Sequence, residues 1–105
     1  MDKAEIKALI NTKKSIFERI STLEKELIEK KNVEKKWANE FWNLTNWEEE
    51  LGVSRPTEKL KKAYVDDKMR FYKADVEACL NNIEMHKRSA EIIDDTLKYL
   101  GGIDD

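Results

Sequence analysis

The sequence has little cysteine, proline and glycine, and it has no long apolar run. Its 105 residues include one cysteine, one proline and three glycines. A single thiol, Cys79, excludes an intrachain disulfide and fits a reducing compartment, so we expect a cytoplasmic protein. No uninterrupted apolar run exceeds three residues, and we therefore expect neither a secretion signal nor a membrane-spanning helix.

Charged residues are abundant, and their balance is nearly even. They make up 40% of the chain, apolar residues make up another 40%, and the net charge is -2. So much charge with so few turn residues favours long, solvated helices over a sheet. The regular spacing of the apolar residues argues against disorder, and the net charge argues against a surface committed as a whole to nucleic acid.

The chain is arranged symmetrically about a short break at residues 51–56, which contains the only proline. Gly52 suits the end of one helix, and Pro56 suits the first turn of the next. Apolar residues follow a heptad pattern before the break, at Ile6, Leu9, Ile16, Ile20, Leu23, Leu27, Trp37, Phe41, Leu44 and Leu51. They follow it again after the break, at Val65, Met69, Tyr72, Val76, Cys79, Ile83, His86, Ala90, Ile93, Leu97 and Leu100.

These two patterns predict an all-α fold, a long antiparallel helical hairpin resembling a coiled coil. We expect one domain over 1–105, with a helix at about 3–51, a turn at 52–56 and a helix at about 57–100. Facing residues should have numbers that add up to about 106, as Leu23 and Ile83 do. The heptad positions are charged at 30–36, but no Gly or Pro lies there, so we expect a continuous helix; a loop is the alternative.

The predicted helix after the break carries a second row of mainly apolar residues, outside the hairpin seam. It recurs every seventh residue, at position c of the heptad, about 100° around the helix from the hairpin seam. A two-helix hairpin would leave this row in water, so we expect the chain to form a homodimer, as a four-helix bundle; a different protein laid on the hairpin is the alternative. The row consists of Tyr64, Phe71, Ala78, Met85, Ile92 and Tyr99.

Aromatic residues gather just before the break. One interpretation is that they form the core and cap of the hairpin tip, since Trp37 and Phe41 belong to the seam. The other is a partner-binding hot spot, because Trp dominates such patches. Trp42 and Trp47 lie off the seam and are our candidates for that role, together with Tyr64, Phe71, Met85, Ile92 and Tyr99.

A basic belt provides a second candidate surface. Such a belt can hold phosphates, and nearby aromatic rings can stack on bases. Acidic residues such as Glu34, Asp66 and Asp67 interleave with it, however, and it could equally meet an acidic protein surface. The candidate residues for nucleic-acid or acidic-surface contact are Lys31, Lys35, Lys36, Lys68, Arg70 and Lys73.

No pattern of residues indicates catalysis, a cofactor or a metal. Cys79 and His86 are about 10.5 Å apart along a helix axis, too far for a nucleophile and its base. A two-metal helical bundle needs Glu-x-x-His pairs, but Ile83 stands three residues before the single histidine. We therefore expect no enzyme, no cofactor and no metal site.

The predicted architecture, with Trp before a central turn, resembles the WXG100 family of small secreted dimeric helical bundles. The family's Trp-x-Gly turn is absent, because Trp47 and Gly52 are separated by residues 48–51. Its C-terminal Tyr-x-x-x-Asp/Glu signal is absent too, since Tyr99 is followed four places on by Ile103. The resemblance implies a helical hairpin that dimerises, and we transfer neither secretion nor any residue role.

Together these patterns predict a non-enzymatic protein–protein interaction module, such as an adaptor, a scaffold or a small inhibitor of a larger protein. It would act as a self-associating helical hairpin, with itself and another protein as partners and no membrane. A helical protein that binds nucleic acid through Lys30–Lys36 and Lys59–Lys73 is one alternative. A small secreted hairpin like those of the WXG100 family is another.

Overall fold

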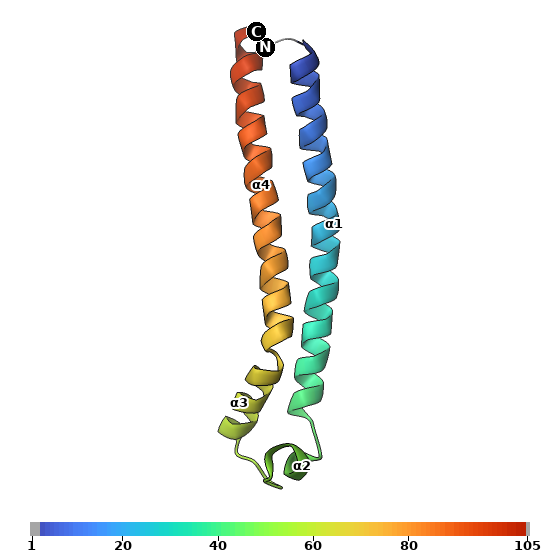
Figure 1. Cartoon of the computed structure of the whole chain (residues 1–105), viewed down its shortest axis with the longest axis vertical. Helices are drawn as coiled ribbons and strands as arrows, with labels where there is room; N and C mark the ends of the chain where they lie inside the picture. The colour runs from blue at the N-terminus through green and yellow to red at the C-terminus, as the bar shows by residue number, and fades with distance from the viewer. Residues whose placement is uncertain (1–2, 105) are drawn as a thin grey trace. The chain divides into compact units, whose positions relative to one another are not determined.

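The computed structural model describes residues 3–104, and their side chains as far as Gly101. This part of the chain contains helices and no strand, so the predicted all-α class is confirmed. No helix within it combines the length and the apolar character needed to cross a membrane. The helices are α1 (Lys3–Trp42), α2 (Trp47–Leu51), α3 (Glu58–Lys68) and α4 (Arg70–Asp104), shown in Figure 1.

The chain divides into two compact units. Unit 1 joins the first part of α1, up to Leu27, to the part of α4 from Ala78 onward. Unit 2 is the continuous segment Ile28–Glu77, which contains the end of α1, the short helices α2 and α3, and the beginning of α4.

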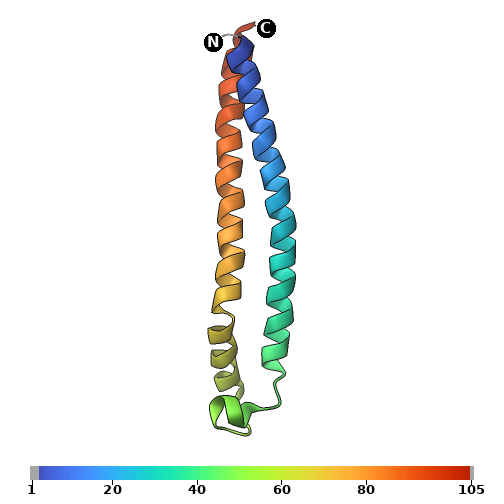
Figure 2. The ribbon, with the colours of Figure 1, turned by 45° about the vertical axis from the view of Figure 1, so that its right-hand side comes forward.

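Unit 1 is an antiparallel pair of helices, α1 beside α4, and both views show them side by side (Figures 1 and 2). The core is formed by Ile20, Leu23, Cys79 and Ile83, and Ile16 and Leu27 pack against it. The antiparallel helical hairpin predicted from the heptads is thus confirmed. Lys13 Nζ lies 2.5 Å from Asp94 Oδ1, and these numbers add up to 107, close to the predicted register.

Helix α1 is continuous through 30–36, so the predicted unbroken helix is confirmed over the alternative loop. The prediction that it extends to residue 51 is wrong, because α1 ends at Trp42 and α2 begins at Trp47. Asn43 Nδ2 donates to the carbonyl oxygen of Asn39, at 2.8 Å. Asn side chains compete with the backbone for such bonds, and the three Asn and Thr residues within 43–46 therefore favour a turn.

The break itself is built much as expected. Gly52 ends α2 in the left-handed region, with φ 71°, and its N–H donates to the Glu48 carbonyl at 2.8 Å. Thr57 is the N-cap of α3, and its hydroxyl accepts a bond from the Leu60 N–H at 3.2 Å. Pro56 therefore precedes the helix instead of lying in its first turn.

The prediction of one helix over about 57–100 is also wrong, since Met69 separates α3 from α4. The interruption is slight, because the Met69 N–H still donates to Val65 and the Lys73 N–H still donates to Met69. No Pro or Gly lies near it. Met69 is only 1% exposed, and its flexible side chain fills the interior of unit 2. The helix is interrupted where this side chain is buried. No local feature of the sequence predicts the interruption.

Candidate protein-binding surface

Most of the predicted position-c row lies on α4 with its side chains in solvent. The exposed fraction is 63% for Met85, 67% for Ile92 and 74% for Tyr99, all in unit 1. Phe71, in unit 2, is 85% exposed. Ala78 is exposed as well. Large apolar side chains at regular spacing on one helix face are typical of a binding surface.

Tyr64 is the member of the row that the fold uses internally. It is half-buried, and its ring meets those of Trp47 and Phe41 edge-on, with centroids 5.4 and 6.3 Å away. Its hydroxyl donates to Glu50 Oε2 at 2.9 Å. Burial, followed by the bond to the Glu50 carboxylate, raises the pKa of Tyr64 above its ordinary value. Tyr64 therefore supports the aromatic core of unit 2.

The two tryptophans proposed as a hot spot occupy different environments. Trp47 is 5% exposed, and the Lys61 ammonium lies 5.4 Å from its ring centroid. Trp42 is 39% exposed, with the same ammonium at 5.9 Å. Trp47 is thus a core residue of unit 2, which its position off the heptad seam did not indicate. Of this pair, Trp42 is the residue that a partner can reach.

Between the exposed apolar residues of α4 lie small polar residues without charge. Ser89 Oγ donates to the Met85 carbonyl at 3.1 Å, and Thr96 Oγ1 donates to the Ile92 carbonyl at 2.8 Å. These residues are not members of the position-c row, although their spacing places them on the same face of α4. Together with the apolar row they form what we call the α4 stripe: Ala78, Asn82, Met85, Ser89, Ile92, Thr96 and Tyr99.

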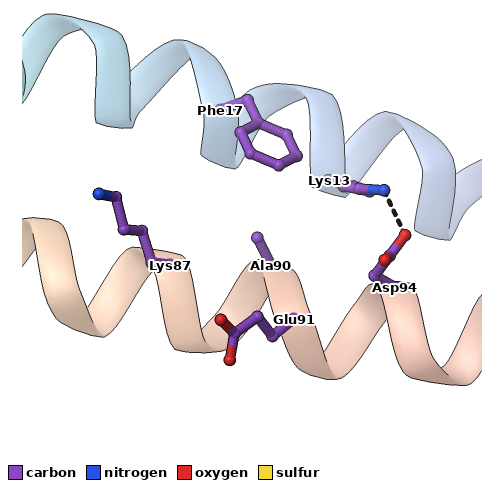
Figure 3. Close-up of a pocket in the computed structure, with 6 residues that line it drawn as sticks. All are labelled: Lys13, Phe17, Lys87, Ala90, Glu91 and Asp94. Carbon is purple, nitrogen blue, oxygen red and sulfur yellow. Dashed lines mark hydrogen bonds and ion pairs between the residues drawn. The ribbon is translucent and has the colours of Figure 1, made fainter.

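A shallow groove of about 280 Å³ lies between α1 and α4 in unit 1 (Figure 3). It opens where Ala90, a small residue, occupies the seam. The exposed ring of Phe17 lies on its α1 side, with the Lys13 ammonium 5.7 Å from the ring centroid. The same ammonium bonds to Asp94, and this bond holds the pKa of the Asp94 carboxyl below its ordinary value. Lys87 and Glu91 complete the lining.

The groove and the α4 stripe are separate surfaces. Met85 and Lys87 are two residues apart on α4, as are Ile92 and Asp94. Two residues correspond to about 200° of rotation around an α-helix. Since Lys87 and Asp94 line the groove, the stripe faces nearly the opposite side of α4.

The basic belt is partly neutralised by ion pairs within unit 2. Lys30 lies 2.8 Å from Asp75, Arg70 lies 3.0 Å from Asp67, and Lys73 is 3.6 Å from Asp66. Two further cations lie over aromatic rings. The Lys36 ammonium is 5.7 Å from the centroid of the Trp37 ring, and the Lys68 ammonium is 5.6 Å from the centroid of the Tyr64 ring. Lys31 and Lys35 are exposed, and neither forms an ion pair with any residue the structure describes.

Cys79 and His86, the single members of their residue types, make local or structural contacts. Cys79 is buried, and its Sγ lies 3.4 Å from the Leu23 carbonyl oxygen. His86 Nδ1 lies 2.8 Å from the carbonyl oxygen of Asn82, one turn earlier in the same helix. Within residues 3–104 there is also no group of three or more His, Cys, Asp or Glu side chains placed to hold a metal ion.

Comparison of the chain with known protein families, with curated proteins and with solved structures gives no match. The architectural resemblance to the WXG100 family therefore gains no support from these comparisons. Among the surfaces of the described residues, the α4 stripe is the most distinctive.

Proposed function

We propose that this chain is a non-enzymatic protein–protein interaction module, an adaptor, scaffold or small inhibitor that binds its partners through α4. The observation that carries the proposal is the exposure of Met85, Ile92 and Tyr99 on a single face of that helix. Covering three such side chains contributes about 4–8 kcal/mol before the costs of association are subtracted. Its single, buried thiol suits a cytoplasmic module.

The shape of this surface favours a helical partner. One large side chain every seven residues gives a narrow row along a helix, and narrow apolar rows pack into the groove of another helix or helix pair. Trp42 and Phe71, both exposed, are further contact candidates in unit 2.

An affinity capture from the native host, run with and without nuclease, tests the proposal. The bait variants are the unchanged chain, the double variant M85E/I92E, and L80E as the matched control. Leu80 is also an exposed apolar residue of α4, but it lies outside the stripe. We expect the unchanged chain and L80E to retain the same protein partner, while M85E/I92E loses it.

Two results of this capture would contradict the proposal. Retention of the partner by M85E/I92E would show that the row is not the contact surface. Release of all bound material by nuclease would favour the nucleic-acid alternative. In that case affinity should fall steeply with salt, because Lys31 and Lys35 would contact phosphates.

A further inference from the structure

We infer that the α4 stripe binds a second copy of this chain, with the two α4 helices antiparallel. The inference rests on the proposed function, because it names the partner of the same surface. It goes further in stating which residues of the two copies meet. Three properties of the stripe support it: its spacing, its lack of charge and its fit to itself.

The spacing of the stripe is that of a second heptad seam. Its positions are 78, 82, 85, 89, 92, 96 and 99, so the intervals alternate between four and three residues. This alternation keeps the positions on one face and is the pattern through which two helices pack as a coiled coil. The first seam of α4 in unit 1 is already occupied, because Cys79 and Ile83 pack against α1. The second seam has the same geometry, and six of its seven residues are exposed.

The composition of the stripe suits removal from water. Its seven positions carry no Lys, Arg, Asp or Glu, in a chain whose residues are 40% charged. The hydroxyls of Ser89 and Thr96 already donate to carbonyls of their own helix. Burying these two hydroxyls therefore leaves no hydroxyl hydrogen without an acceptor, and the carboxamide of Asn82 is the one group between Ala78 and Thr96 that would need a new partner or water.

The order of large and small side chains selects the antiparallel arrangement. In an antiparallel coiled coil, a residue from one class of seam position faces a residue from the other class. The stripe then pairs Met85 with the partner's Ser89, Ile92 with the partner's Asn82, and Ala78 with the partner's Thr96. Each layer of the interface from residue 78 to residue 96 therefore contains one larger and one smaller side chain, as good packing requires.

A parallel arrangement fits less well. It would place identical residues in each layer, so that Met85 meets Met85 and Ser89 meets Ser89. Layers with two large side chains would alternate with layers of two small ones, which leaves gaps between helices held apart by the large pairs. The antiparallel pairing avoids this alternation and gives the dimer a two-fold axis that crosses the stripe at the level of residue 87 along the helix.

The area involved suits a weak dimer. From their exposed fractions, Met85 and Ile92 with the smaller residues that face them offer roughly 400 Å² per chain, while Tyr99 lies beyond the paired layers, at the level of the partner's residue 75. Two copies would bury roughly 800 Å², which is in the range of weak, transient interfaces. We therefore expect a dimer that dissociates on dilution.

Sedimentation equilibrium of the full chain over a range of concentrations tests self-association. We expect a mass twice that of one chain, falling toward the monomer on dilution. M85E and I92E should be monomeric at every concentration, while L80E should behave like the unchanged chain. A monomer at all concentrations would overturn the inference, whereas the proposed function would then be decided separately by the affinity capture.

Disulfide trapping tests the orientation. Cys79 stays in place, since it is buried, and the unchanged chain provides the background. A mixture of A78C and T96C chains should cross-link to each other under mild oxidation. Y99C alone should not, because the two sulfurs would be about 36 Å apart along the helix axes. Efficient Y99C dimers without A78C–T96C dimers would overturn the antiparallel arrangement and leave self-association intact.

Discussion

The two units bury their cores with different kinds of side chain. Unit 1 packs aliphatic and small residues, with Leu23 and Ile83 beside Cys79, and it needs no element besides α1 and α4. Unit 2 packs rings. Trp37 stacks on Tyr72 with centroids 6.2 Å apart and contacts Phe41 at 5.7 Å. Trp47 and Tyr64 join this cluster from α2 and α3.

The difference shows how the size of the core side chains decides how many helices a core needs. Two helices are enough to cover the aliphatic and small residues on the seam of unit 1. No further helix packs there, and the outer row of α4 therefore stays in solvent. Rings on a seam are too large for two helices to cover, and unit 2 covers them with α2 and α3. Tyr64 is enclosed in the process. The remaining large residues of the row on α4, above all Met85, Ile92 and Tyr99, are thereby available to a partner.

The largest effect is expected at the aromatic core of unit 2. Trp47→Ala should lower the free energy of unfolding by about 3–5 kcal/mol, because it removes a buried ring and leaves a cavity. Trp42→Ala, the matched control, should cost clearly less, about 1 kcal/mol, since Trp42 is 39% exposed and Trp47 only 5%. Urea unfolding followed by circular dichroism at fixed protein concentration measures both. Equal costs would show that the rings of unit 2 do not form a core.

A somewhat smaller effect is expected at the aliphatic seam of unit 1. Leu23 is 3% exposed, and Leu23→Ala should cost about 2–5 kcal/mol through lost burial and an unfilled cavity. Leu80 is 44% exposed, and Leu80→Ala should cost less than about 1 kcal/mol. The same unfolding assay compares them. If Leu80→Ala were the more costly change, the seam would have to be assigned to another face of α4.

The smallest effect concerns the ion pair at the groove of unit 1. The bond from Lys13 lowers the pKa of Asp94, so the pair stabilises the fold above the ordinary carboxyl pKa of about 3.9. This contribution is lost as pH falls through the lowered value. Lys13→Met should raise the Asp94 pKa toward its ordinary value, as measured by NMR titration of the carboxyl carbon. It should also make stability less sensitive to acid.

Lys98→Met is the control for this titration. Lys98 Nζ lies 3.5 Å from the other carboxylate oxygen of Asp94, a longer contact than that of Lys13. Its replacement should therefore raise the pKa by a smaller amount. A larger change with Lys98→Met than with Lys13→Met would contradict the assignment of Lys13 as the main partner.

Much of the fold could be predicted because its signals are local. Heptad spacing indicated the helices and the antiparallel register. Gly52 indicated the end of a helix, since a glycine tolerates positive φ. The errors arose where a local signal was weak or absent. The Asn and Thr residues at 43–46 favour a turn, but only modestly, and the distortion at Met69 has no Pro or Gly to announce it.

The candidate surface was predicted in part. The row at position c follows from spacing alone, and Met85, Ile92 and Tyr99 are exposed as that spacing implies for a two-helix hairpin. The burial of Tyr64 and Trp47 could not be predicted, because it depends on contacts among α1, α2 and α3 that the sequence pattern does not specify. The groove beside Phe17 was not predicted either, because it depends on how Ala90 packs against α1.

The order of residues by itself determined the helical class, the pairing of the two long helices and the existence of a second apolar row. Each follows from a fixed repeat of about 3.6 residues per turn, which places side chains on faces before any packing occurs. Only the tertiary structure decided which aromatic rings became core and which stayed outside. That choice depends on the volume of each ring and on the helices available to enclose it, and no local repeat encodes either quantity.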